Sequence, residues 1–423
     1  MNTVRVLLSV AVNNAWPLFQ MDVKNAFLHG DLEEKVYMKL HPGHSRENEP
    51  NKVCRLHKAI YGLKQSHRAC YSKLSSVLEA AGFKMSHVDS SLFVQSSIAG
   101  KLVVRIYVDD LIIAGDNISE IKTLKQLLHQ KFAIKDLGPL KYFLRIEVAT
   151  SSKGLFLNQR KYVLNLLDEA NMMECKPAQT PLASKLQWHE NGEPLSDPSV
   201  YQRMVGKLIY LTITRPDISY SVSLASQFMH PPNLVHWEIV KRILRYLKGS
   251  VGKGIIMKNN GSNHILAYTD ADWTGNALDR KSTTGFCTFV GGNLVTWKSK
   301  KQTVIARSSA EVEYRAMAAT ACELIWLKGL LSELGFTRMA HMSLYCDNQA
   351  AMHIASNPVF HERTKHIEVD CHYICTQVQS KVIDTVFTCS HDQLDDLFIK
   401  ALDSTQFQRL LCKLGSINPL DPA

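Results

Sequence analysis

The stretch Leu102–Ala114, LVVRIYVDDLIIA, decides the fold of this chain. Two runs of β-branched and aliphatic residues flank the adjacent carboxylates Asp109 and Asp110, which predicts a hairpin with the acids near its turn. Aspartates are depleted from strands and seldom buried unpaired, so a cation is their expected partner. Mg²⁺ prefers one or two carboxylates plus substrate phosphates, as nucleotidyl transfer requires. An exposed β-turn also accommodates such a pair, so further residues must support the interpretation.

A third carboxylate, Asp22, stands upstream at the end of a short apolar strand, within Gln20–Gly30 (QMDVKNAFLHG). One carboxylate from this strand and a pair from the hairpin can hold two metal ions about 3.5–4 Å apart. One ion would activate the attacking oxygen and the other would steady the leaving oxygen.

Several segments resemble the polymerase of copia-type LTR retrotransposons. They are Met21–Leu32 (MDVKNAFLHGDL), Tyr61–Gln65 (YGLKQ), Tyr107–Ile113 (YVDDLII) and Lys131–Val148 (KFAIKDLGPLKYFLRIEV), followed in order by matches from Tyr201 to Leu402. The resemblance implies an RNA-directed DNA polymerase, a transferase whose carboxylates are Asp22, Asp109 and Asp110. It also implies an RNA template, dNTPs and two Mg²⁺ ions per site, with Mn²⁺ as a substitute.

The pattern changes from about Ser262. A strand at His264–Thr269, a hairpin through Gly291-Gly292-Asn293, a long helix at Ser309–Leu334 and a strand at Met342–Cys346 resemble the ribonuclease H fold. The resemblance implies an endonuclease that cuts the RNA strand of RNA–DNA hybrids.

Four acids match those of that family: Asp270, Glu313, Asp347 and Asp396. Their mutual repulsion is costly without cations, so two Mg²⁺ ions are expected. Three neighbours compete for these roles, namely Asp272, Glu311 and Asp395. The end of the strand favours Asp270, the tetrapeptide Glu-Tyr-Arg-Ala favours Glu313, and the usual Ala-Asp of the family favours Asp396.

The net charge of +10 over 423 residues predicts a polyanionic partner. On the helix that ends near Gly249, Lys241, Arg245 and Lys248 share one face, which either tracks a nucleic-acid backbone or is an ordinary solvated face. The motif HERTKHIEVDCHYI, residues 361–374, resembles a family motif and offers Arg363, Lys365 and His366 as nucleic-acid contacts. Its histidines, including His361, fit a packing role equally well.

The predicted class is α/β (α+β). The expected domains are a reverse-transcriptase palm/thumb-like domain (1–180), a helical connection (181–261), a ribonuclease H-like domain (262–402) and a C-terminal tail (403–423). Ten cysteines without a paired framework predict reduced thiols and an intracellular location, cytoplasmic or nuclear. No apolar run of membrane-spanning length occurs in the sequence, and oligomeric state is left open.

The chain departs from the family pattern at a few positions. Arg145 stands at a glycine position, His67 at a proline and Cys70 at a tryptophan. The family also carries a basic fingers hairpin before the helix at Thr3, so we expect an N-terminally truncated polymerase with weak activity. Three hypotheses follow: a polymerase–ribonuclease H, a non-catalytic relic that binds RNA–DNA hybrids, and a nuclease alone.

Overall fold

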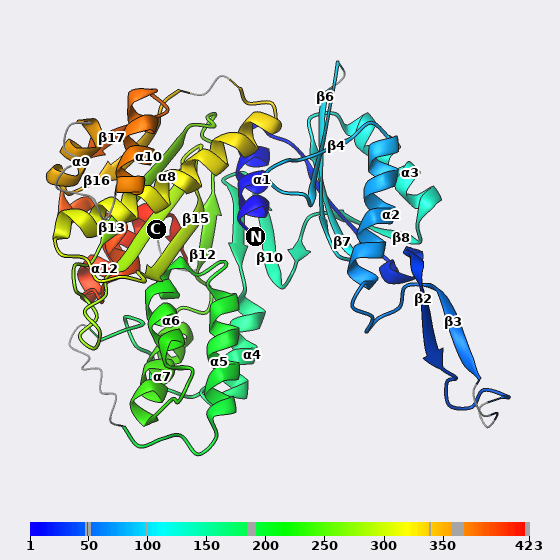
Figure 1. Ribbon diagram of the computed structural model, residues 1–423, viewed down its shortest axis with the longest axis horizontal. Coiled ribbons are helices and arrows are strands. Elements are labelled where there is room, and N and C mark those ends of the chain that lie inside the picture. The colour runs from blue at the N-terminus through cyan, green and yellow to red at the C-terminus, as the bar shows by residue number, and fades with distance from the viewer. Residues whose placement is uncertain are drawn as a thin grey trace. The chain divides into compact units, whose positions relative to one another are not determined.

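The computed structural model describes residues 1–46, 49, 52–98, 100–183, 192–337, 340–357 and 368–418. These residues form two compact units. Unit A consists of residues 15–140 and 332–335, and unit B of residues 1–14, 141–331 and 336–423. Many of their elements are labelled in Figure 1.

Unit A is built on a six-stranded antiparallel sheet of order β4-β5-β6-β7-β1-β8. Its strands are β1 (Leu18–Val23), β4 (Lys84–Met85), β5 (Leu92–Ser97), β6 (Gly100–Tyr107), β7 (Asp110–Gly115) and β8 (Ile134–Pro139). The predicted sharing of one sheet by the Asp22 strand and the Asp-Asp hairpin is confirmed, because β1 lies directly beside β7.

Two helices of unit A, α2 (Ser66–Ala80) and α3 (Ile118–Lys131), pack in one apolar core with the sheet (Figure 1). That core takes alternate residues of the strands, among them Met21 and Val23 of β1. Because side chains alternate along a strand, Asp22 projects to the opposite face. The Asn117 side chain caps α3 by accepting hydrogen bonds from the amides of Ser119 and Glu120.

A separate antiparallel ribbon, β2 (Asp31–Lys39) with β3 (Val53–Lys58), belongs to unit A and is exposed along most of both strands. It follows the short 3₁₀ turn η1 (Ala26–His29).

Unit B contains the sheet β15-β14-β13-β16-β17, in which three antiparallel strands are continued by two parallel ones. Its strands are β13 (Ile265–Ala271), β14 (Thr283–Val290), β15 (Asn293–Lys301), β16 (Met342–Cys346) and β17 (Ile383–Phe387). The long helix α8 (Ser309–Glu333) contributes its apolar residues to the unit's interior. The bounds of β16 agree with the prediction, and α8 differs by one residue.

A second antiparallel sheet of unit B joins segments that are distant in sequence, in the order β18-β12-β11-β10-β9. Its strands are β9 (Tyr142–Phe143), β10 (Ile146–Ser151), β11 (Gly154–Asn158), β12 (Gly254–Met257) and β18 (Ser416–Ile417). The remaining helices of unit B are α4 (Arg160–Glu169), α5 (Pro198–Leu211), α6 (Ser219–Ala225), α7 (Leu234–Lys248), α9 (Gln349–Ser356), α10 (Glu368–Gln379), α11 (Asp396–Ile399) and α12 (Ser404–Leu414).

The first helix, α1 (Asn2–Asn13), belongs to unit B and is almost wholly buried there. Arg5 donates from Nε to the carbonyl of Val295 at 2.6 Å, and its guanidinium lies 3.8 Å from the centre of the Trp297 ring. The Ser9 hydroxyl donates to the carbonyl of Val290 at 2.7 Å. Through these contacts α1 packs against the β14–β15 hairpin and belongs to the same unit.

The observed units divide the chain differently from the predicted boundaries. Residues 1–14 and 141–180, expected in the palm/thumb domain, belong to unit B with the ribonuclease H-like sheet. The segment expected as a tail forms α12 and β18, and its residue Phe407 joins the same core as α7. No helix among the described residues has the length and apolarity needed to cross a membrane.

Candidate active sites: two groups of carboxylates

The first group lies where β6 turns into β7. Tyr107 and Asp110 are paired across the strands, so the turn between them contains only Val108 and Asp109. Asp22 of β1 is the register partner of Asp110. The sheet therefore brings the three predicted polymerase carboxylates to one place.

The turn is strained. Val108 has a φ of +53°, in the left-handed region that β-branched residues disfavour. The surrounding sheet must hold this conformation, which fixes where Asp109 projects. A backbone bond from the amide of Val23 to the carbonyl of Asp109, at 2.8 Å, ties the turn to β1.

Hydrogen bonds orient two of these carboxylates. Gln20 donates to Asp110 Oδ1 at 3.0 Å, and the Tyr61 hydroxyl donates to Asp109 Oδ2 at 3.2 Å. Asp109 Oδ1 is buried and has no hydrogen-bond partner. Burial raises the pKa of Asp110, and the charges of Asp22 and Asp109 raise it further. A bound cation would neutralise these carboxylates and would give Asp109 Oδ1 a partner.

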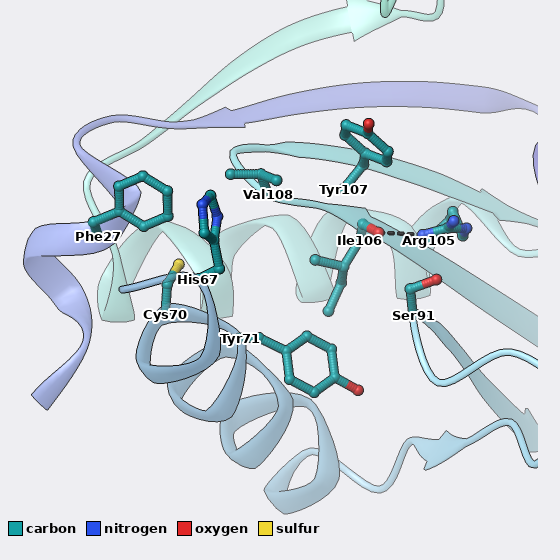
Figure 2. Close-up of a pocket in the computed structure, with 9 residues that line it drawn as sticks. All are labelled: Phe27, His67, Cys70, Tyr71, Ser91, Arg105, Ile106, Tyr107 and Val108. Carbon is teal, nitrogen blue, oxygen red and sulfur yellow. Dashed lines mark hydrogen bonds between the residues drawn. The ribbon is translucent and has the colours of Figure 1, made fainter. Parts of the chain in front are cut away.

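A cavity of about 260 Å³ adjoins the turn. In Figure 2, Phe27 and His67 lie side by side, with Val108 of the turn nearby and Cys70 below. The Phe27 and His67 rings meet edge to face at a centroid distance of 4.7 Å. Burial, with a smaller contribution from Asp109, raises the pKa of the Cys70 thiol to about 11, so it stays protonated and apolar in character. Cys70 is one of the residues that line this cavity.

The second group lies in unit B. Asp270 is the penultimate residue of β13, and Asp347 directly follows β16. Glu313 projects from the second turn of α8. Ligand atoms of Glu313, Asp347 and Cys346 lie within 4.8 Å of one another. Within the described residues this is the one trio of acidic, histidine or cysteine side chains that meets so closely; the aspartates of unit A do not.

Burial dominates the electrostatics of this second group. Asp270 and Glu313 are 5% and 6% exposed. Burial, then the charges of Asp347 and Asp396, raise the pKa of Asp270 to about 7. Burial, then the charge of Asp270, raise the pKa of Glu313 to about 10. At neutral pH Glu313 therefore keeps its proton and Asp270 is partly protonated, and a divalent cation would displace these protons.

Asp396 is engaged differently. It begins α11, pairs with Lys400 at 2.5 Å and accepts a bond from Gln406 at 3.3 Å. It is close enough to Asp270 to affect its pKa, but it is outside the trio of Glu313, Cys346 and Asp347.

Two of the three competing acids have other partners. Asp272 accepts a hydrogen bond from the amide of Thr283, and Glu311 accepts from the amide of Arg307 at 2.8 Å and from Arg315 at 3.0 Å. Asp395 is fully buried, and neither of its oxygens has a hydrogen-bond partner. These contacts support the choice of Asp270 and Glu313 over their neighbours.

The predicted nucleic-acid contacts are only partly described. Lys241, Arg245 and Lys248 lie on α7 and are half-buried, and Lys241 pairs with Glu238 at 2.6 Å. Arg363, Lys365 and His366, with His361, fall outside the described residues.

The sequence did not identify two groups at the second site. Ser390 donates to Asp347 Oδ2 at 2.7 Å and holds that carboxylate in place. Cys346 accepts a 3.4 Å bond from the amide of Asn348. Cys346 could have been identified as a site residue only from its position next to Asp347. Nothing in the local sequence indicated that Ser390 lies at the site.

The residues of both groups fit divalent cations. Each group contains a buried carboxylate oxygen without a partner, Asp109 Oδ1 in the first and Glu313 Oε2 in the second. Oxygen ligands in a negative cluster suit Mg²⁺ or Mn²⁺.

A palm-like sheet with an Asp-Asp turn and a ribonuclease H-like sheet with converging acids define the reverse transcriptase–ribonuclease H class. The family model "Reverse transcriptase (RNA-dependent DNA polymerase)" matches residues 1–184. The chain is 44% identical over 417 residues to the retrovirus-related Pol polyprotein from transposon RE2 of Arabidopsis thaliana, covering 98% of this chain and 29% of that polyprotein. A transposon Ty5-1 protein of Saccharomyces cerevisiae is 33% identical over 308 residues, which are 72% of this chain and 100% of that protein.

The solved structure of LC11-RNase H1, isolated from compost, matches 35% of this chain and 99% of its own, with 14% identity and a TM-score of 0.25. On the sequence relationships, the chain belongs to the family of copia-type retrotransposon Pol polyproteins, in their reverse transcriptase and ribonuclease H region. It spans less than a third of the length of the RE2 polyprotein.

Proposed function

We propose that this chain hydrolyses the RNA strand of RNA–DNA hybrids and also extends primers on an RNA template, each by two-metal chemistry. Ribonuclease H activity is the function that the geometry supports best. The observation that carries it is that Asp270, Glu313 and Asp347, from two strand ends and one helix, lie close enough for their charges to shift the pKa values of Asp270 and Glu313.

In the nuclease site, Asp270, Glu313 and Asp347 would hold the cations. Mg²⁺ ions bound there would supply Lewis-acid activation of water and stabilise the departing 3′ oxygen. Asp270 and Asp347 stand on neighbouring parallel strands, so their separation is set by the sheet. Ser390 keeps Asp347 in one orientation through its 2.7 Å bond. Protons held by Asp270 and Glu313 in the metal-free state would pass to solvent on loading.

Primer extension is the second function, favoured by the pairing of Asp22 with Asp110 and by the orphaned oxygen of Asp109. The RNA template, the hybrid and the dNTPs are partners expected from the family. The net charge of +10 supports binding to them.

The test uses the full chain with a labelled RNA–DNA hybrid in Mg²⁺. Asp270→Asn should reduce the cleavage rate by about a thousandfold or more, since several kcal/mol of metal-dependent stabilisation is lost. Hybrid binding should persist, with log affinity falling by about 0.9 per phosphate neutralised for each unit of log salt. Asp279→Asn is the control, because Asp279 is a surface partner of Lys301.

Cleavage in the parent chain that survives Asp270→Asn would contradict the proposal. If the folded parent binds hybrid but cleaves nothing in Mg²⁺ or Mn²⁺, the non-catalytic binding hypothesis replaces it.

A further inference from the structure

We propose that the nuclease site of this chain also binds Zn²⁺ through Glu313, Cys346 and Asp347, and that this binding inhibits hybrid cleavage. The inhibitory consequence rests on the proposed ribonuclease H function, whereas the binding itself does not. The juxtaposition adds a thiol, which Mg²⁺ does not use, to two carboxylates that suit both ions.

The three side chains are positioned by regular structure. Cys346 is the last residue of β16, Asp347 follows it directly, and Glu313 approaches from α8. Their ligand atoms lie within 4.8 Å of one another. Two ligands of a tetrahedral zinc ion are about 3.5 Å apart, given Zn–S near 2.3 Å and Zn–O near 2.0 Å. Small side-chain rotations that bring these atoms to about 3.5 Å from one another, with a water as the fourth ligand, would complete a tetrahedral site.

Unsatisfied groups at this place point to a ligand. The side chain of Glu313 is 6% exposed, and its Oε2 has no hydrogen-bond partner. Cys346 is fully buried, yet its sulfur accepts a 3.4 Å hydrogen bond from the amide of Asn348. The same amide would donate to the sulfur of a metal-bound thiolate. Asp347 is held by Ser390 through Oδ2, which leaves Oδ1 for a metal.

Ligand chemistry selects the ion. Mg²⁺ is a hard cation that takes oxygen ligands, and it gains little from sulfur. Zn²⁺ takes thiolate, carboxylate and imidazole ligands and binds such sites more tightly than Mg²⁺. On binding, a Zn–S bond forms and the thiol proton of Cys346 passes to water. Zinc held this way would occupy Glu313 and Asp347 and prevent the catalytic arrangement of Mg²⁺.

The binding test is X-ray absorption at the zinc edge. Three exposed thiols would bind zinc elsewhere, so the starting protein is the full chain with Cys322→Ser, Cys389→Ser and Cys412→Ser. Loaded with one equivalent of Zn²⁺, it should show one sulfur at about 2.3 Å and oxygen or nitrogen ligands at about 2.0 Å. Adding Cys346→Ser should remove the sulfur contribution. A spectrum without sulfur in the starting protein, or one that Cys346→Ser leaves unchanged, overturns the proposal.

The inhibition test measures hybrid cleavage in excess Mg²⁺ with increasing Zn²⁺, each variant being normalised to its own zinc-free rate. Cys346→Ser should raise the half-inhibitory zinc concentration at least tenfold. Cys375→Ser is the matched control, because Cys375 is another buried thiol of unit B that lies outside the trio. Equal zinc sensitivity in the parent and Cys346→Ser would refute the inhibitory role.

The two tests separate the possible failures. If the parent cleaves nothing without zinc, the proposed nuclease function fails while the absorption spectrum still decides the binding site. If Cys346→Ser does not fold, Glu313→Gln replaces it, because this variant keeps the thiol and should bind less than one equivalent of zinc. Full zinc binding by a folded Glu313→Gln protein counts against the site.

Discussion

Asp22 and Asp110 face one another across adjacent antiparallel strands, β1 and β7. A register partner on the same sheet face has its Cβ about 4.5–5.5 Å away, so two like charges are held close by the backbone itself. The Gln20 amide binds only one oxygen of Asp110, at 3.0 Å. The two carboxylates repel one another at this separation, so the pair in unit A favours the binding of a cation.

Asp109→Asn should abolish primer extension on poly(rA)/oligo(dT) in Mg²⁺. The change removes the negative charge of Asp109, whose Oδ1 has no hydrogen-bond partner. A loss of several kcal/mol of metal-dependent transition-state stabilisation corresponds to a decrease of about a thousandfold or more in rate. Asp136→Asn is the control on the same sheet, since Asp136 is an exposed partner of Lys125. Extension by the Asp109→Asn protein at the parental rate would remove the polymerase assignment.

The metal-free protein should lose stability as pH rises from about 5 to about 7. Burial raises the pKa values of Asp270 and Asp272 to about 7, above the unfolded value of about 3.9, so the folded state binds more protons in this window. Their contribution is present below the unfolded pKa and is lost as pH rises through the folded pKa. The lowered pKa values of groups such as Asp392 act below this window.

Chemical denaturation in EDTA measures this effect. Asp270→Asn should reduce the decline by about 1 kcal/mol or more, and saturating Mg²⁺ should remove the part due to Asp270 because bound cations favour its ionised carboxylate. An identical pH slope in the parent and Asp270→Asn would contradict the burial of Asp270 as the cause.

Arg145→Gly should stabilise the protein by about 1 kcal/mol. Arg145 lies in the two-residue turn between β9 and β10 with a φ of +60°, a conformation that glycine adopts without strain. The guanidinium also lies 5.7 Å from the centre of the Tyr162 ring. Arg145→Ala is the matched variant, because it removes that contact and keeps the strain. Unfolding midpoints should rank glycine above alanine, and the reverse order would show that strain is unimportant here.

Asp395→Ala should also stabilise the protein, by about 1–3 kcal/mol, the cost of a buried polar group without a partner. The Asp395 side chain is fully buried, its oxygens have no neighbour beyond a weak contact with the Cys287 thiol that could satisfy them, and burial raises its pKa well above the usual range. Urea denaturation at pH 7 provides the measurement. Destabilisation in both Asp395→Ala and Asp395→Asn would mean that the carboxyl has a stabilising role in the fold.

Regular elements were predictable where local patterns are strong. The strand Met342–Cys346 alternates buried and half-buried residues, and the Gly291-Gly292 turn fixes the β14–β15 hairpin through two positive φ angles. The acids at strand ends followed from the same patterns, because strand ends place side chains at the edge of a sheet.

Long-range pairings were not predictable in this way. Strand β12 pairs with β11 and β18, which lie about a hundred and a hundred and sixty residues away, and no local signal encodes such partners. The hydrogen bond from Ser390 to Asp347 likewise joins residues 43 positions apart. The sequence of α1 predicted a helix but not the hairpin against which it packs. The predicted palm/thumb domain of residues 1–180 therefore differs from the unit that contains α1.

That placement of α1 has a consequence for synthesis. The carbonyl that receives Arg5 belongs to a residue 290 positions later, with residues 15–140 of unit A encoded in between. At about 5–20 residues per second, the ribosome would deliver that partner roughly 15–60 s after α1 emerges. During this time the apolar face of α1 has no native surface to cover it, so the nascent chain should depend on a chaperone until β15 is made. Unit A is continuous from residue 15 to residue 140 and faces no such delay over that stretch.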